Sequence, residues 1–247
     1  MKSLLKMTWM EVKLFLREPV GAFFTLAFPL MMLFLFGSIY GNTPTPMFGG
    51  YGTIDISVPA YTAMIIATSG LMSITITMAA YRENGVLRRL RTTPISPLII
   101  LAAQVIVVFV MTSLGMALLV TAGKLVYHMR FDGSAWSVLG GFVLASLSFF
   151  SLGFILAGLM PNARTAQIVG MVMLYPMLFL SGAGFPSELL PEAIKKISTF
   201  LPLTYVVNLL RGLWIGEAWG KHLLDVGVLA GMLVLGIVIS AKTFRWE

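Results

Sequence analysis

The chain has 247 residues, of which 58% are hydrophobic and 11% are charged, and its mean hydropathy is +0.91. Soluble domains carry roughly 25% charged residues, so this composition excludes an ordinary soluble protein and requires lipid to cover much of the apolar surface. The net charge of +7 comes from short basic clusters between apolar runs, which favours anionic lipid or a cytoplasmic partner over nucleic acid, and the lack of cysteine excludes disulfides. We expect one all-α membrane domain over residues 1–247.

Residues 1–18 predict an amphipathic interfacial helix at the inner face of the membrane. Basic residues recur at spacings of four, seven and four beside an apolar stripe, as a turn of roughly 100° per residue requires. Two interpretations stay open: a basic membrane anchor, or a lever between a cytoplasmic partner and the membrane domain. The basic stripe is Lys2, Lys6, Lys13 and Arg17, and the apolar stripe is Leu5, Trp9, Val12 and Leu16.

Six apolar runs predict transmembrane helices. A helix satisfies its own backbone polar groups, and about 20 residues cross a hydrocarbon core of about 30 Å. One run is shorter and more polar at its start, but its apolar part is uninterrupted. The predicted spans are residues 20–40, 59–80, 98–120, 137–159, 165–182 and 223–241.

Residues 200–216 are apolar but contain Pro202, Asn208 and Arg211, so we expect a re-entrant outer segment there rather than a seventh span. An Arg at the centre of a bilayer costs roughly 2.5 to 3.5 kcal/mol on insertion scales. With six spans, eleven Lys and Arg residues fall on the side of the N-terminus and six on the other. This bias predicts that both ends of the chain are cytoplasmic.

Residues 81–97, between the second and third spans, predict a short cytoplasmic helix. Its apolar residues share one face, its arginines project around them, and Pro94 and Pro97 stop it. Such a helix suits a socket on another protein, although a basic loop against lipid explains the same residues equally well. The apolar face is Val86, Leu87 and Leu90, and the arginines are Arg82, Arg88, Arg89 and Arg91.

The second span carries Ser69, Ser73 and Thr77 at intervals of four residues. Small hydroxyl residues in this pattern predict either close helix packing or a mildly polar wall of a substrate pathway. The fifth span offers a flexible and aromatic surface that suits varied apolar ligands, or else simply faces lipid or the core. The residues of that surface are Met171, Tyr175, Leu178 and Phe179.

The segment before the last span is rich in proline and polar residues. We expect it to cap the pathway as an outer gate, or else only to break and solvate a long external loop. No catalytic constellation or metal site is expected, since His128 and His222 are far apart in sequence and predict surface histidines. The gate residues are Phe185, Pro186, Pro202 and Tyr205.

Several motifs together carry a family resemblance. The stretch Glu83-x-Gly85-x-x-x-Arg89-Leu90-x-x-x-Pro94 resembles the coupling-helix signature of ABC-2 type permeases, and Arg17-Glu18-Pro19 resembles the end of their connecting helix. Gly184-Phe185-Pro186, Pro191 and Pro202-Leu203-Thr204-Tyr205 resemble the segment before their last span. Many members have Glu where this chain has Arg88, and this departure suggests the daunorubicin-type and other multidrug branches. The resemblance assigns ATPase coupling to Arg82, Glu83, Gly85, Leu87, Arg88, Arg89, Leu90, Arg91 and Pro94.

The resemblance implies the permease subunit of an ATP-driven exporter in a bacterial cell membrane, moving drugs or other amphipathic molecules outward. It would pair with a second permease, expected to be another copy, and with two separate ABC ATPase subunits. ATP and Mg would bind there, because this chain has no G-x-x-x-x-G-K-[ST] loop. A lipid or polysaccharide-precursor exporter is the alternative. A stand-alone channel or secondary carrier is disfavoured, because no acidic residue lies near the centre of a predicted span.

Overall fold

The computed structural model describes residues 8–10, 12–13, 19–86, 97–186, 188 and 190–243, and helices dominate them. Two π-helical segments, η1 and η3, and two 3₁₀ turns, η2 and η5, interrupt or connect the α-helices. The elements are α2 Pro19–Ala22, η1 Phe23–Ala27, α3 Phe28–Tyr40, η2 Pro46–Phe48, α4 Thr53–Thr68, η3 Ser69–Ile74, α5 Thr75–Glu83, α7 Pro97–Tyr127, α8 Ala135–Leu159, α9 Ala163–Leu180, α10 Glu192–Ser198, α11 Pro202–Trp214, η5 Trp219–His222 and α12 Leu223–Thr243.

Six helices in the described part of the chain are long and apolar enough to cross a membrane, which confirms the predicted fold class. The second is longer than the predicted 59–80, because α4, η3 and α5 form one continuous helix from Thr53 to Glu83. The helix α11 has 13 residues, so at 1.5 Å per residue it is about 20 Å long and too short to cross a bilayer. Its position before the last long helix agrees with the predicted non-spanning segment.

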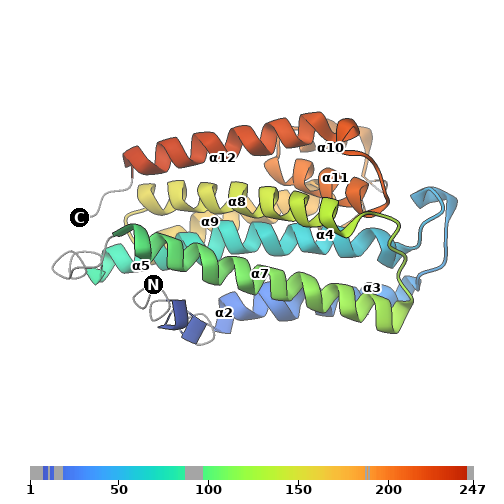
Figure 1. Cartoon of the computed structure of the whole chain (residues 1–247), viewed down its shortest axis with the longest axis horizontal. Helices are drawn as coiled ribbons and strands as arrows, with labels where there is room; N and C mark the ends of the chain where they lie inside the picture. The colour runs from blue at the N-terminus through green and yellow to red at the C-terminus, as the bar shows by residue number, and fades with distance from the viewer. Residues whose placement is uncertain are drawn as a thin grey trace.

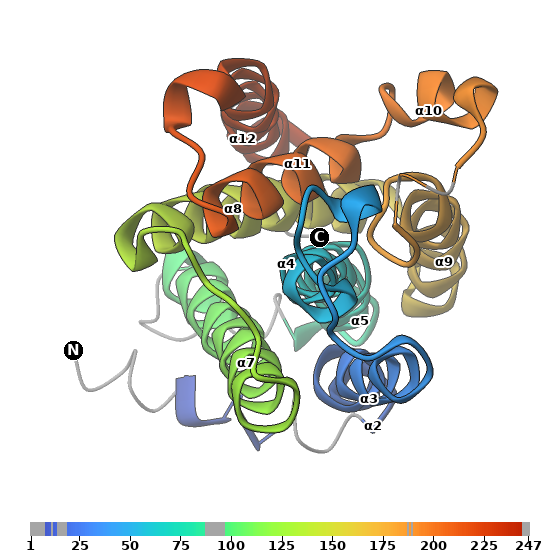
Figure 2. The same ribbon diagram turned by 90° about the vertical axis from the view of Figure 1, so that its right-hand side faces the viewer.

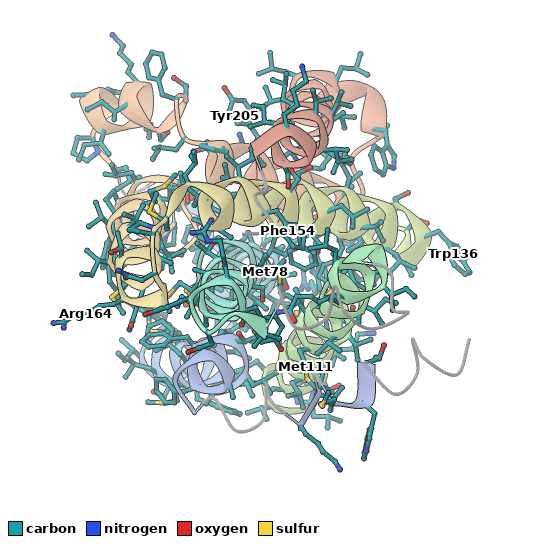
Figure 3. All side chains as sticks on the ribbon, turned by 90° about the vertical axis from the view of Figure 1, so that its left-hand side faces the viewer. Met78, Met111, Trp136, Phe154, Arg164 and Tyr205 are labelled. Carbon is teal, nitrogen blue, oxygen red and sulfur yellow. The ribbon has the colours of Figure 1, made fainter. Side chains whose placement is uncertain are left out.

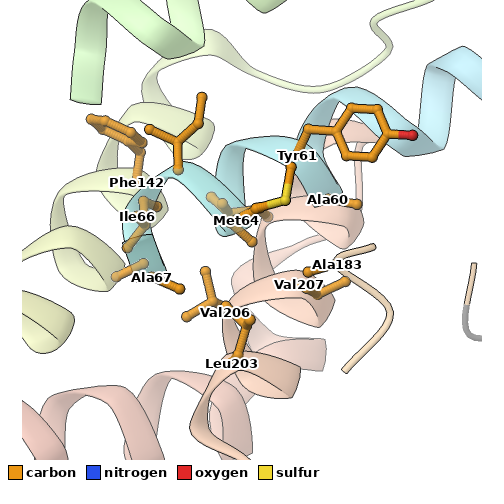
Figure 4. Close-up of a cluster of buried hydrophobic side chains, with 14 of the residues drawn as sticks. Ala60, Tyr61, Met64, Ile66, Ala67, Phe142, Ala183, Leu203, Val206 and Val207 are labelled. Carbon is orange, nitrogen blue, oxygen red and sulfur yellow. The ribbon is translucent and has the colours of Figure 1, made fainter. Parts of the chain in front are cut away.

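The helix α4 occupies the centre of the bundle, where α3, α7, α8, α9 and α11 surround it (Figures 1 and 2). The last helix, α12, packs along α8 on the side away from α3. Figure 4 shows the centre of this core, where Ala60 and Met64 of α4 face Val206 and Val207 of α11. Burial of these apolar side chains fixes the position of α4, and the loops lie at the ends of the bundle.

Glycines let the central helix approach its neighbours backbone to backbone. A Cβ at Gly153 of α8 would overlap the carbonyl oxygen of Gly70, and one at Gly70 would lie 2.5 Å from the carbonyl oxygen of Phe149. On the other side, a Cβ at Gly170 of α9 would lie 2.6 Å from the carbonyl oxygen of Leu71. The π-helical segment η3 is therefore packed tightly between α8 and α9.

The bundle has two distinct ends (Figure 1). One, here called the Glu83 end, holds the last residues of α5, the turn from α8 to α9 and the end of α12. The other, the Tyr51 end, holds the α3–α4 loop, residues 128–134 and η5. The two ends present different side chains and are described separately below.

Most of the predicted interfacial helix over residues 1–18 lies outside the described residues. Within the described part, Val12 packs against Val107 and Met111 of α7. The ammonium of Lys13 lies 5.3 Å from the centre of the Trp9 ring, a cation–π distance.

Candidate functional site

Two charged side chains at the end of α5 join this helix to both α8 and α9. Arg82 donates from Nη1 to the carbonyl oxygen of Gly158 at 2.9 Å, and Glu83 Oε2 accepts from the backbone N–H of Ala163 at 2.9 Å. The last carbonyls of a helix and its first N–H groups lack partners within the helix and attract cations and anions respectively. Arg82 and Glu83 therefore cap α8 and α9 from a third helix.

The remainder of the predicted coupling segment begins directly after this contact. Gly85 has φ of +65°, a left-handed conformation that residues with a side chain rarely adopt, so the chain turns there after α5 ends. On the same face of the bundle, Arg164 of α9 projects into the surroundings (Figure 3). The other coupling residues lie outside the described residues: Leu87, Arg88, Arg89, Leu90, Arg91 and Pro94.

The predicted pathway residues of the second span lie inside the packed bundle. Ser69 is 1% exposed, and its Oγ lies 3.0 Å from the hydroxyl of Thr112 on α7. Ser73 is also buried, and its hydroxyl has no partner among the described residues. Thr77 is half-buried on α5. Within one chain these residues take part in helix packing, and their role in transport stays a prediction.

The predicted residues of the fifth span lie around a small cavity. Tyr175, Leu178 and Phe179 line about 60 Å³ of space between α9, the central helix and η1, whereas Met171 packs against the core beside it. Tyr175 and Phe179 are also exposed on the surface of the chain. The cavity's other lining residues are Phe24, Phe28, Met64, Thr68, Met72 and Leu174.

The Tyr51 end holds a larger cavity of about 400 Å³, which we call the aromatic cleft. Its walls come from α3, the α3–α4 loop, the start of α4 and the chain after α9, which meet at this end of the bundle (Figure 2). The ring centre of Phe185 lies 5.9 Å from that of Phe36 and 5.9 Å from that of Phe179, so Phe185 contacts one residue that lines the cleft and one that lines the smaller cavity. The lining residues are Phe36, Tyr40, Thr45, Met47, Phe48, Thr53, Ser57, Tyr61, Gly184, Phe185 and Pro186.

Of the four predicted gate residues, the structure brings Phe185 and Pro186 together at the cleft and places the other two elsewhere. Pro202 begins α11, where its missing N–H costs no helical hydrogen bond. Tyr205 donates its hydroxyl to the carbonyl oxygen of Thr199 at 2.6 Å and does not line the cleft. Pro202 and Tyr205 thus shape the connection from α10 to α11.

A buried carboxylate fixes the loops around the cleft. Asp55, 1% exposed, accepts from Asn42 Nδ2, from the N–H of Arg130 and from the N–H of Gly52, each at 2.8 Å. Asn42 Oδ1 accepts in turn from the N–H of Ile54 at 3.0 Å. Three charge-assisted hydrogen bonds make this a strong junction of the α3–α4 loop, α4 and the segment after α7.

A second contact joins the same loop to the far side of the bundle. The Tyr51 hydroxyl donates to Asp132 Oδ2 at 3.1 Å. Burial raises the pKa of Tyr51, and the hydrogen bond to Asp132 raises it further. Trp214, at the end of α11, donates from Nε1 to the carbonyl oxygen of Arg130 at 3.3 Å. Hydrogen bonds therefore join the α3–α4 loop to residues 130–132, and these residues to α11.

The prediction that His222 lies at the surface is wrong. Its ring is buried between two carboxylates, with Nδ1 2.9 Å from Asp225 Oδ2 and Nε2 3.0 Å from Glu217 Oε2. The close approach is possible because Gly212 has no side chain, since a Cβ there would overlap the ring. The hydrogen bond from Lys221 lowers the pKa of Glu217, burial opposes this, and His222 adds to the lowering.

Arg211, whose charge argued against a seventh span, is paired with Glu188. Its side chain lies beside a small pocket of about 20 Å³ that adjoins the aromatic cleft and shares Ser57, Tyr61 and Phe185 with it. The charge of Arg211 is therefore neutralised by Glu188 next to the cleft, and neither residue lines the cleft itself.

Comparison with known proteins decides the family, because residues 2–214 match the model of the ABC-2 type transporter. The chain belongs to this family. Nodulation protein J of Neorhizobium galegae is 27% identical over 233 residues, which cover 92% of this chain and 86% of that protein. The Putative transport permease YvfS of Bacillus subtilis is 28% identical over 204 residues, which cover 82% of this chain and 81% of that protein.

Nodulation protein J of Rhizobium leguminosarum bv. viciae is 34% identical over 102 residues, and there the match spans 41% of this chain and 39% of that protein. In this ABC-2 type chain the site residues predicted from the sequence fall in three places. Arg82 and Glu83 cap two helices at the Glu83 end, Ser69 and Ser73 lie in the packed centre, and Phe185 lies at the cleft. Apart from Phe185, the aromatic residues of the cleft were not predicted, although the spacing of Phe36 and Tyr40 by four residues places both on one face of α3.

Proposed function

We propose that this chain is the permease subunit of an ATP-driven exporter, which forms the substrate pathway and takes its energy from separate ABC ATPase subunits. Members of the ABC-2 family are transport permeases that work with such partners, and the six apolar helices suit a multi-pass membrane protein. The observation that carries the proposal is the pair of caps made by Arg82 and Glu83. They connect the segment of predicted coupling residues to two helices at once.

The caps supply a mechanical route. A partner that pulls or turns the segment after Glu83 would move the end of α5. Because Arg82 and Glu83 are bonded to the α8–α9 turn, that turn would follow. The helix α9 carries Tyr175 and Phe179, so motion at the Glu83 end would reach the small cavity through a packed helix.

The pathway in this proposal runs along α9 toward the Tyr51 end. The small cavity ends at Phe179, whose ring stacks on Phe185 at the edge of the aromatic cleft. Displacement of this ring pair would join the two spaces. Apolar and aromatic walls suit drugs or other amphipathic molecules moving outward, with ATP binding shifting the population of open and closed states.

The orientation and assembly belong to the same proposal. The excess of Lys and Arg in the segments at the Glu83 end supports a cytoplasmic location for that end and for both chain termini in a bacterial plasma membrane. Two ATPase subunits would bind there, and a second copy of this chain would complete the membrane part. The surfaces of Tyr175 and Phe179 on α9 are exposed and thus available to such a copy.

The proposal is tested by reversing the charges of Arg88, Arg89 and Arg91 to Glu in the chain expressed with its ATPase. We expect the ATPase to be lost from the purified complex while the permease still inserts in the membrane. The control reverses Lys124, in the last turn of α7, and Arg130, in the segment after α7, both at the Tyr51 end of the bundle. Retained ATPase, with transport-linked ATP hydrolysis at the wild-type rate, would contradict the proposed coupling.

A further inference from the structure

We propose that the aromatic cleft is a binding site for an uncharged aromatic compound that carries one hydroxyl or carbonyl group. This inference deepens the proposed function, in which the cleft would be the last subsite before release. Binding itself requires neither ATP nor a partner, so it can be measured on this chain alone.

The size and walls of the cleft suit a small ligand. Its volume of about 400 Å³ lies within the range of roughly 300 to 1,000 Å³ that is usual for small-molecule sites. Phe36 and Tyr40 come from successive turns of α3, and Tyr61 comes from the facing helix α4. Phe48 and Phe185 also line the space, and aromatic side chains attract another aromatic ring in offset or edge-to-face contact.

The charges around the cleft select for a neutral ligand. Among the residues that the structure describes, none that lines the cleft carries a charge, and the guanidinium of Arg211 in the adjoining pocket is already paired with Glu188. A charged ligand would lose its hydration without gaining a partner of opposite sign. A sugar is also a poor fit, because most of its hydroxyls would face aromatic carbon and remain unpaired.

One polar group in the wall lacks a partner. The Thr45 hydroxyl is buried and makes no hydrogen bond within the described part of the chain. The backbone around it is well defined, because the carbonyl oxygen of Thr45 accepts from Phe48 at 3.2 Å and from Gly50 at 3.0 Å, and its N–H donates to Tyr51 at 3.1 Å. Because the hydroxyl oxygen is buried, the Thr45 side chain must shift slightly toward the cleft before a ligand with one hydroxyl or carbonyl group can satisfy it.

The test uses the full chain in lipid nanodiscs and a photoreactive probe, 4-[3-(trifluoromethyl)diazirin-3-yl]benzyl alcohol. We expect saturable labelling of the peptides that contain Phe36 to Phe48 or Gly184 to Pro186, and its suppression by non-photoreactive 4-(trifluoromethyl)benzyl alcohol. The benzoate form of the probe should label these peptides about tenfold less, because burying an unpaired carboxylate is costly. Lipid-facing residues of α12 should be labelled in proportion to probe concentration.

Variants separate a built site from simple partitioning into lipid. Thr45→Val should weaken labelling by the alcohol probe about fivefold, as expected for one lost hydrogen bond, and leave a phenyl diazirine without the hydroxyl unchanged. Tyr40→Leu should weaken both probes by a few fold. Phe200→Leu, which removes an exposed ring outside the cleft, is the matched control and should change neither.

Three results would overturn the site: labelling of the cleft that rises linearly like that of α12, displacement by octyl glucoside but not by the aromatic competitor, or loss of labelling when two copies associate. Failure of the proposed function looks different. If the reconstituted complex does not couple ATP hydrolysis to transport while saturable labelling persists, only the exporter role is wrong.

Discussion

Polar contacts hold the segments together at each end of this bundle, but the contacts at one end are more deeply buried than those at the other. At the Tyr51 end, the carboxylate of Asp55 is buried and accepts three hydrogen bonds, two from the α3–α4 loop and one from the segment after α7. At the Glu83 end, the half-buried Arg82 and the exposed Glu83 cap the neighbouring helices. Breaking a buried charged contact leaves unpaired groups without water, whereas water can replace an exposed one. The difference suggests one end that keeps its shape and one that can move.

The largest expected effect comes from Asp55→Ala. It removes the acceptor of the Gly52 and Arg130 N–H groups and leaves Asn42 Nδ2 with the carbonyl oxygen of Tyr127 at 3.2 Å. We expect the free energy of unfolding to fall by about 3 kcal/mol or more. Denaturant titration in mixed micelles measures this loss. Glu192→Ala, which removes an exposed carboxylate from α10, is the control and should change stability by less than about 0.5 kcal/mol. Equal effects would remove the contrast between buried and exposed contacts.

The second prediction concerns the space around His222. In Gly212→Ala the new Cβ would overlap the imidazole ring and force it away from Glu217, so we expect a loss of about 2 kcal/mol. His222→Ala removes the ring and should make the glycine substitution nearly harmless in the double variant. Additive losses in the double variant would show that Gly212 does not serve to admit the ring.

The sequence predicted the long helices well because their signal is local. Apolar runs of sufficient length need no knowledge of their neighbours, and six of them became the six long helices. The second helix begins at Thr53 and not at the predicted residue 59. A charged Asp55 argues against a membrane helix in the sequence alone, and only the structure shows that Asn42 and Arg130 donate hydrogen bonds to it. His222 failed for the same reason: its burial depends on Gly212 and Glu217, ten and five residues earlier.

The candidate sites also differ in how far local sequence patterns could predict them. The positions of Arg82 and Glu83 in a coupling motif were readable from spacing, but their contacts with Gly158 and Ala163 join residues about 80 positions apart. The aromatic cleft combines four segments that meet only after the bundle has packed, so no local pattern predicts it. Of its lining residues, Phe185 and Pro186 were selected in advance as gate residues, as part of a motif.

The variant Glu83→Ala tests the cap at the Glu83 end of the bundle. The loss of one surface cap should reduce the free energy of unfolding by only about 0.5 to 1 kcal/mol, much less than Asp55→Ala does. In the reconstituted complex the same variant should lower substrate transport per ATP hydrolysed, because the α8–α9 turn loses a bond to α5. Glu83→Gln keeps an acceptor oxygen and should retain most of the coupling. If Glu83→Ala transports as much substrate per ATP hydrolysed as the wild type, the proposed mechanical route is wrong.

The smallest expected effect is the dependence of stability on pH at Glu217, which lies just before the last long helix. Its pKa in the folded chain is below the ordinary value of 4.5, chiefly because Lys221 donates a hydrogen bond to the ionised carboxylate. The ionised form therefore stabilises the folded state above pH 4.5, and this stabilisation is lost as the pH falls through the lowered pKa. The wild type should exceed Glu217→Gln in stability by less than about 1 kcal/mol near pH 6, and the gap should close in acid. Lys221→Met removes the main cause, so the difference from Glu217→Gln in that background should be smaller and should vanish nearer pH 4.5. A gap that widens in acid would mean that the protonated carboxyl is the stabilising form, and the contact between Glu217 and Lys221 would then add nothing to the stability of the Tyr51 end.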